Sequence, residues 1–184
     1  MISERARASF DTLLKRAMCE HLSVSPEVPC EVEVIEGIDH IEEEEFVVLT
    51  VSSYLFRLVV LFYFTGNEET REHFAKLIRT PAKRLDDKVF YDAVSEFGNL
   101  CCGSINRDLG RHFPHVGMST PNVLRRGSIA FLDTLGAEYI QHFKIDLGTS
   151  IRFHATICVC EYGDLDFNAE AKVVEENLGE LELF

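Results

Sequence analysis

Five residues within the stretch Asp92–Asn106 have the types and spacing of a polar surface on one side of a helix. They are Asp92, Glu96, Asn99, Gly103 and Asn106. At about 100° per residue, these positions fall within an arc of roughly 80°. The arc combines two carboxylates, a carboxamide one turn after Glu96, and a glycine that leaves a gap. We therefore expect a helix face that can enter the active site of another protein.

The alternative for this polar stripe is the solvated side of an amphipathic helix. A solvated side is usually filled with Lys, Glu, Gln or Arg, whereas Asn and Gly inside a helix each cost up to about 1 kcal/mol relative to Ala. Two asparagines and a glycine on one stripe therefore favour a contact surface. Gly lets another backbone come near, and Asn offers both a hydrogen-bond donor and an acceptor.

The elements that must position the stripe follow from hydrophobic periodicity. Helical spacing predicts helices over Ser3–His21, Asn67–Arg79 and about Asp86–Leu109. The buried side of the last helix is expected to hold Val89, Phe90, Ala93, Val94, Phe97, Leu100, Cys101 and Ile105. Strands are predicted over Cys30–Ile38, Glu45–Ser52 and Tyr54–Phe64, and the third is central because it is almost wholly apolar. Further along, we expect a strand and a loop over Ser119–Leu135, then a hairpin of Glu138–Leu147 and Ser150–Cys160.

This succession of elements predicts an α+β fold, in which helices pack on one face of a mainly antiparallel sheet in the order α-β-β-β-α-α-β-β-β. A chain of 184 residues with 46% hydrophobic content has enough material for one sizeable core. We expect a single domain over residues 1–168. Residues 169–184 are acidic and weakly helical, and we expect them to form a C-terminal tail or a docked helix.

The charge and the apolar segments narrow the range of partners. A formal net charge of −13 argues against binding to nucleic acid or to an anionic membrane surface, because either would be repelled. The longest apolar run, Leu58–Phe64, is much too short to span a bilayer. The N-terminal residues lead into an amphipathic helix without an apolar signal core, so we expect a cytoplasmic protein without membrane insertion.

Neither the cysteines nor the histidines predict a metal site. The six cysteines lack a paired C-x-x-C spacing, so we expect reduced core residues rather than a zinc site or a disulfide framework. The neighbours Cys101 and Cys102 point about 100° apart on a helix, which disfavours a thiol nucleophile. His112 with His115, and His142 with His154, form pairs without a third ligand and are interpreted as structural.

Two charged segments have ordinary interpretations as well. The run Glu42–Glu45 is expected to make a solvated turn before a strand, with docking of a basic partner as the alternative. Arg125 and Arg126 are interpreted as exposed charges at a strand end.

The stripe also carries a family resemblance. Asp92-x3-Glu96-x2-Asn99, followed twenty-two positions later by Pro121, resembles the signature of the CheC/CheX/FliY-type chemotaxis phosphatases. The resemblance covers roughly residues 31–160, although the spacing to Pro121 is one residue shorter than the family pattern. None of the other five asparagines has a glutamate three residues before it, so one site per chain is expected. That is more like the single-site CheX branch, whose members pair as homodimers.

The resemblance implies a phosphatase that hydrolyses the phosphoaspartate of a CheY-like receiver domain in chemotaxis or other two-component signalling. Asn99 is then expected to orient the attacking water and Glu96 to pair with the receiver's active-site lysine. Asp92, Gly103 and Asn106 are expected to contact this partner. The resemblance implies no cofactor in this chain, because the Mg²⁺ belongs to the receiver. The alternative function is a non-catalytic CheX-like interaction module that binds a receiver or another signalling protein.

Overall fold

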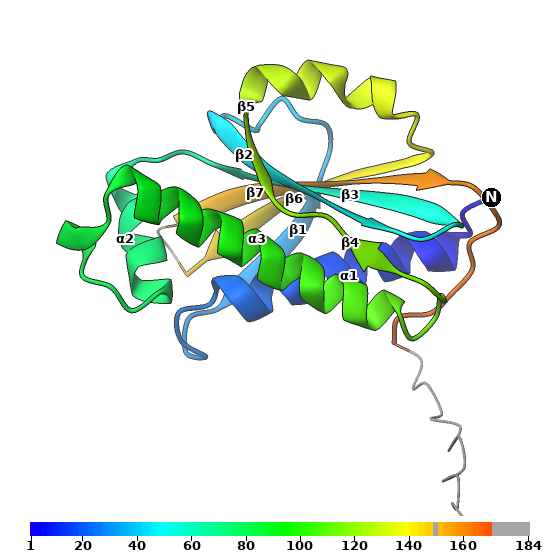
Figure 1. The fold of residues 1–184 in the computed structure, drawn as a ribbon, viewed down its shortest axis with the longest axis horizontal. Coiled ribbons are helices and arrows are strands. Elements are labelled where there is room, and N and C mark those ends of the chain that lie inside the picture. Colours follow the sequence, from blue (N-terminus) through cyan, green and yellow to red (C-terminus); the bar gives the residue numbers. More distant parts are fainter. Residues whose placement is uncertain (149–150, 171–184) are drawn as a thin grey trace, which may run out of the picture.

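The computed structural model describes residues 1–148 and 151–170. Within these ranges one antiparallel sheet is built from β1 (Cys30–Ile35), β2 (Glu45–Ser52), β3 (Phe56–Phe64), β4 (Gly117–Met118), β5 (Asn122–Arg125), β6 (Tyr139–Leu147) and β7 (Ile151–Glu161). The spatial order is β1-β6-β7-β3-β2-β4, and β5 also pairs with β2. The predicted α+β class with a mainly antiparallel sheet is confirmed (Figure 1).

The apolar strand β3 lies inside the sheet, as its sequence predicts. It pairs with β2 on one side and with β7 on the other, so that Val60 lies between Leu49 and Ile157. Apart from Arg57, every residue of β3 is buried. A strand with an apolar neighbour on both sides and on both faces needs such a composition. The sheet therefore has a firm centre on which the helices can pack.

Each of the three α-helices among the described residues begins at a side chain that accepts a backbone hydrogen bond. They are α1 (Glu4–Leu22), α2 (Glu68–Leu77) and α3 (Asp87–Leu109). The caps are Ser3, Asn67 and Asp86, which accept from the amides of residues 6, 70 and 89. Such caps satisfy amides that have no partner within the helix. The helix ends lie within two residues of the predicted ends.

The main core lies between the sheet and the helices, where α1 and α3 pack against each other (Figure 1). Aromatic rings join the layers: the Phe62 ring on β3 lies 4.5 Å from the Phe97 ring on α3 and 5.1 Å from the Phe153 ring on β7. Edge-to-face aromatic pairs add about 0.5–1.5 kcal/mol each to the stability that comes from burial alone. These contacts fix α3, and with it the predicted stripe, relative to the sheet.

The opposite face of the sheet carries a second, smaller cluster under the 3-10 helix η2 (Arg126–Leu135). Ile129 of η2 packs there with residues that include Phe46, Leu61 and Tyr63. Figure 1 shows η2 on the side of the sheet away from α1 and α3. The sequence prediction of a strand within Ser119–Leu135 is met by β5, whereas the predicted loop is largely η2. Helical structure therefore covers part of both faces.

The two outer edges of the sheet differ in character. One edge is β1, on which Glu31, Glu33 and Val34 are exposed. At the other edge, β4 and β5 lie one after the other along β2, with Val51 facing Met118 and Phe46 facing Leu124. The short strands β4 and β5 thus cover an edge of β2 next to α3.

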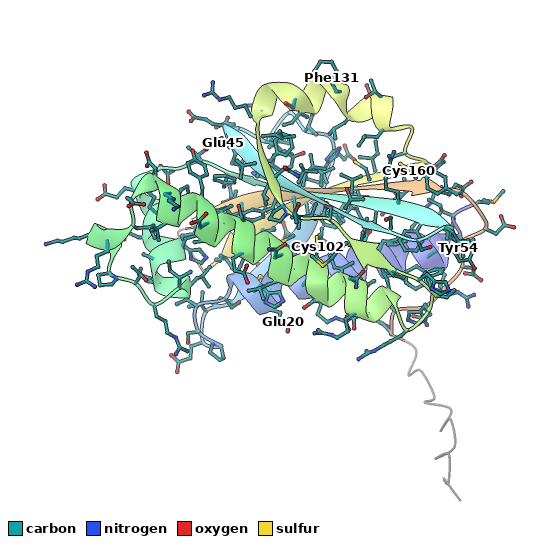
Figure 2. All side chains as sticks on the ribbon, in the orientation of Figure 1. Glu20, Glu45, Tyr54, Cys102, Phe131 and Cys160 are labelled. Atoms are coloured by element: carbon teal, nitrogen blue, oxygen red, sulfur yellow. A yellow bond between two sulfur atoms is a disulfide. The ribbon has the colours of Figure 1, made fainter. Side chains whose placement is uncertain are left out.

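The prediction of six reduced core cysteines is wrong for two of them. Cys19 near the end of α1 and Cys30 at the start of β1 form a disulfide, with their Cα atoms 5.5 Å apart. The spacing of 11 residues did not indicate this pair in the sequence, because the two cysteines come together only when the loop between them places the end of α1 beside β1. The other four cysteines are free and buried. Burial raises the pKa of the Cys102 thiol, which lies on α3 (Figure 2), to about 12, so this thiol is protonated at neutral pH.

Two further sequence predictions concern membranes and the tail. Within the described ranges, no helix has the length and apolarity to cross a membrane. Most of the predicted acidic tail, residues 171–184, lies outside the described residues. At the last described part of the chain, the Ala169 amide donates to Ser9 Oγ at 3.1 Å, so the chain up to that point lies on α1.

Candidate functional site

All five residues of the stripe lie on α3, and two of them make direct contact. The Asn99 carboxamide donates to Glu96 Oε2 at 3.5 Å, which is a long hydrogen bond between side chains one turn apart. Asp92 and Glu96 are exposed, and Asn99, Gly103 and Asn106 are partly exposed. Within the described residues, no hydrogen bond links the side chains of Asp92 or Asn106 to this pair. The centre of the candidate site is therefore Glu96 with Asn99.

Gly103 provides the gap that the sequence predicts. A Cβ atom built on Gly103 would meet no heavy atom within 4 Å. Its backbone is helical, so no special dihedral angle calls for a glycine here. Asn106 is less open, because its Oδ1 atom is buried and has no hydrogen-bond partner among the described residues. Any partner contact of Asn106 must therefore use another part of this side chain.

Gly98 is a positioning residue that sequence reasoning missed. A Cβ atom on Gly98 would lie 2.8 Å from Leu49 Cδ1 and 3.3 Å from Val47 Cγ1, both on β2. This glycine lets α3 approach the sheet closely between the two central site residues, Glu96 and Asn99. The signal was available in the sequence, because Gly98 falls on the apolar side of the helix, where an alanine or a larger residue is usual.

Leu100 corrects the predicted buried side of α3. It was expected in the core, but 48% of its surface is exposed. The physical reason is its angle of about 200° from Gly98, the residue that marks the direction of the sheet. Leu100 follows Glu96 by four residues and precedes Gly103 by three, so it borders both on the helix surface. An exposed apolar side chain therefore lies beside the polar stripe.

Neighbouring elements hold α3 from both sides. On one side, the segment that contains β4 and β5 contacts α3 and is held on β2, where Thr50 and Ser119 exchange hydrogen bonds of 2.8 and 3.0 Å. On the other side, α1 contributes a 2.8 Å contact between His21 Nε2 and Ser104 Oγ. Because the stripe is carried by one helix fixed at both flanks, its side chains project from a rigid support.

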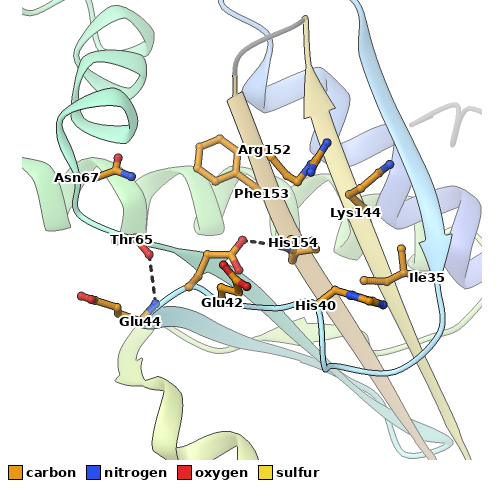
Figure 3. A pocket seen from close by; sticks show the side chains of 11 residues that line it. Ile35, His40, Glu42, Glu44, Thr65, Asn67, Lys144, Arg152, Phe153 and His154 are labelled. Atoms are coloured by element: carbon orange, nitrogen blue, oxygen red, sulfur yellow. Dashed lines mark hydrogen bonds and ion pairs between the residues drawn. The ribbon is translucent and has the colours of Figure 1, made fainter.

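A cavity of about 680 Å³ lies elsewhere, near the start of β7, and none of the stripe residues lines it (Figure 3). His154 Nδ1 and Glu43 Oε1 are 2.6 Å apart at its wall, and both side chains are nearly buried. The expectation of a solvated turn over Glu42–Glu45 is therefore wrong for Glu43, whose carboxylate pairs with His154, 111 residues later. The candidate site is an open helix face, which suits a macromolecular partner better than a small enclosed substrate.

The remaining candidates from the sequence keep structural roles. His142 Nδ1 contacts Thr156 Oγ1 at 2.8 Å, and His154 has its own partner in Glu43, so the two histidines do not act as a pair. Among residues 1–148 and 151–170, no group of three or more His, Cys, Asp or Glu side chains could hold a metal ion. Arg125 ends β5 and Arg126 begins η2, and both are exposed as predicted.

Comparison with known proteins gives the class of this fold. Neither a family model nor a curated protein matches the sequence. Among solved structures, the CheX-CheY-BeF3-Mg²⁺ complex from Borrelia burgdorferi is similar with a TM-score of 0.60 and 14% identity, over 84% of this chain and 97% of that chain. Chemotaxis protein CheX from Vibrio vulnificus gives 0.56 and 15%, over 83% and 97%.

A third similar structure is the FliM-SpeE complex from H. pylori, with a TM-score of 0.55 and 11% identity, over 86% of this chain and 89% of that chain. Similarity at such low identity establishes a common fold. The chain therefore has the fold of the CheC-like and CheX chemotaxis proteins, as the resemblance of its sequence predicts.

Proposed function

We propose that this protein is a phosphatase that hydrolyses the phosphoaspartate of a CheY-like receiver domain. The observation that carries the proposal is the pair of Glu96 and Asn99, which projects from an open face of α3 in a chain with the CheX fold. A CheX protein of this fold has been solved together with CheY, BeF3 and Mg²⁺, which supports a receiver as the partner.

The proposed reaction is attack of water on the phosphorus of the acyl phosphate. The bond from phosphorus to the aspartate oxygen breaks, and the products are inorganic phosphate and the free carboxylate. An acyl phosphate is already reactive, so the reaction needs an oriented water in line with the leaving oxygen more than a strong base. Asn99 orients this water through its carboxamide. The Mg²⁺ that neutralises the phosphoryl oxygens belongs to the receiver.

Glu96 has a different role, which is to fix the position of the receiver. Its exposed carboxylate pairs with the receiver's active-site lysine, and the charge of this chain, −13, favours approach of a basic group. Because Gly103 has no side chain, the receiver can come close to the backbone of α3 at this position. Asp92 and the accessible part of Asn106 extend the contact along the same face, and Leu100 adds an apolar contact at its border.

The alternative is an interaction module that binds a receiver or another signalling protein without hydrolysis. The similar fold in the FliM-SpeE complex favours this possibility, since that structure too is an assembly with another protein. Release of inorganic phosphate from a phosphorylated receiver, measured with and without this protein, distinguishes the two functions. A catalytic amount of the protein should accelerate release if it is a phosphatase. A module that only binds would leave the rate unchanged or lower it.

Replacing Glu96 with alanine should weaken the complex with the receiver by about tenfold at low salt, because it removes one member of an intermolecular ion pair. The difference from the unchanged protein should shrink at high salt, where charges are screened. Titration of a receiver at two ionic strengths measures this effect. Glu72→Ala, which removes an exposed carboxylate from α2, is the matched control and should have little influence. An equal loss in both variants would contradict the proposed contact.

We also propose that the protein forms a homodimer, as expected for the single-site CheX branch. Light scattering at micromolar concentration should give a mass near twice the 20.9 kDa of one chain. A monomer under these conditions would contradict the dimer, while the phosphatase proposal would stand on its own assay.

A further inference from the structure

The disulfide between Cys19 and Cys30 joins a helix and a strand at the surface of the fold. Cys19 lies in the last turns of α1, and Cys30 is the first residue of the edge strand β1. Both residues are partly exposed. The four free cysteines are at most 2% exposed, and burial raises the pKa values of three of them, Cys101, Cys102 and Cys158. Thiol reagents in solution therefore reach only the bonded pair.

The part of α1 that this disulfide holds is also the part that contacts α3. His21 Nε2 lies 2.8 Å from Ser104 Oγ, and Arg16 donates to Asp108 at 2.6 Å. Ser104 is not part of the stripe, but it directly follows the stripe residue Gly103 in the sequence. A disulfide bond between the end of α1 and β1 therefore also restrains α3, which carries the candidate site, through these contacts.

We propose that Cys19 and Cys30 form a reversible thiol–disulfide pair, exchanged by low-molecular-weight thiols and disulfides of the glutathione type, that sets how firmly the end of α1 holds α3. In the oxidising direction, one cysteine thiolate attacks glutathione disulfide and releases one glutathione. The second cysteine then attacks the mixed disulfide and releases the other. Two protein thiols are oxidised, one glutathione disulfide is reduced, and both protons end on the released glutathiones. This exchange is independent of the proposed phosphatase activity.

Counting thiols after denaturation, once the folded protein has been oxidised or reduced, tests the exchange. After incubation with glutathione disulfide and then denaturation, four thiols should react. After incubation with dithiothreitol under native conditions, removal of the reductant and denaturation, all six should react. Closing the loop between Cys19 and Cys30 restricts the unfolded chain, so the oxidised form should melt about 5–10 °C higher than the reduced form. Six reactive thiols after oxidation, or four after native reduction, would overturn the proposal.

Cysteine variants locate the effect. Cys19→Ser and Cys30→Ser should each abolish the difference in melting temperature between oxidising and reducing conditions. Cys102→Ala is the control: whatever its own stability, it keeps the bonded pair and should keep the difference. Because each variant is compared with itself in two redox states, a general loss of stability does not obscure the result. A difference that persists in Cys30→Ser would exclude this pair as its origin.

The link to the candidate site has its own measurement. Amide hydrogen exchange over residues 101–107 of α3 should be at least about threefold faster in the reduced form than in the oxidised form, because local opening becomes easier. Cys30→Ser should show the faster exchange in both redox conditions. Equal exchange in the two forms would show that the pair acts on α1 alone and would overturn the proposed effect on α3.

Discussion

Asn99→Ala should reduce the catalysed hydrolysis of a receiver phosphoaspartate by at least about a hundredfold, which corresponds to roughly 2.7 kcal/mol of transition-state stabilisation. The substitution removes the carboxamide that we propose orients the water, while the exposed Glu96 carboxylate remains to pair with the receiver. Binding should therefore be only mildly weaker. Saturating kinetics with a phosphorylated receiver separates the two quantities, because the loss should appear in kcat rather than in KM.

The stability of the Asn99→Ala variant must be measured alongside its activity. Asn99 is partly exposed and its one hydrogen bond is long, so the free energy of unfolding should change by no more than about 0.5 kcal/mol. Asn168→Ala, at an exposed asparagine outside α3, is the control for removing a carboxamide. Full activity in Asn99→Ala would end the proposed mechanism. A large loss of stability would instead mean that the stripe is structural.

The same substitution at two glycines of α3 should have opposite effects on stability. Gly98→Gln should lower the free energy of unfolding by at least about 3 kcal/mol, because the new side chain meets Leu49 at close range and buries an amide. Gly103→Gln should leave stability equal or raise it by up to about 1 kcal/mol, since the site is open and Gln favours helix. Urea unfolding of both variants measures this contrast.

Gly103→Gln should nevertheless impair the protein, because its side chain fills the gap on the docking face. Receiver binding should weaken although the fold is intact. If Gly103→Gln unfolds the protein, the glycine is packed internally and the contact face lies elsewhere on α3. If it binds the receiver normally, the close approach at Gly103 is not part of docking.

The periodic parts of the sequence predicted the fold well. The apolar run of β3 indicated a central strand, and the helical spacing over Asn67–Arg79 indicated α2. The stripe on α3 could be found because all five of its residues belong to one helix, where a single angle per residue sets the face. The prediction that Leu100 is buried was wrong. This residue lies on the side of α3 away from Gly98 and the sheet, but it is an apolar residue beside the polar stripe, and its residue type alone favoured the core.

Features that depend on distant segments could not be predicted from local pattern. The contact between Glu43 and His154 joins residues 111 positions apart, and the disulfide depends on how a loop returns over the end of α1. The 3-10 helix η2 has too short a repeat to stand out from a loop in the sequence. Gly98 was visible as a glycine, but its role became clear only when β2 was placed beneath it.

The open sheet edge at β1 bears on how the protein behaves when it is concentrated. If two copies joined their β1 strands, the exposed Glu31 and Glu33 of one copy would come close to the same carboxylates of the other. Like charges on paired strands oppose such pairing, which is how edge strands commonly avoid continuous sheet growth. Concentrated salt screens this repulsion. Stocks of the protein should therefore resist fibrous or amorphous aggregation best in dilute buffer, and ionic strength becomes the condition to control during purification and storage.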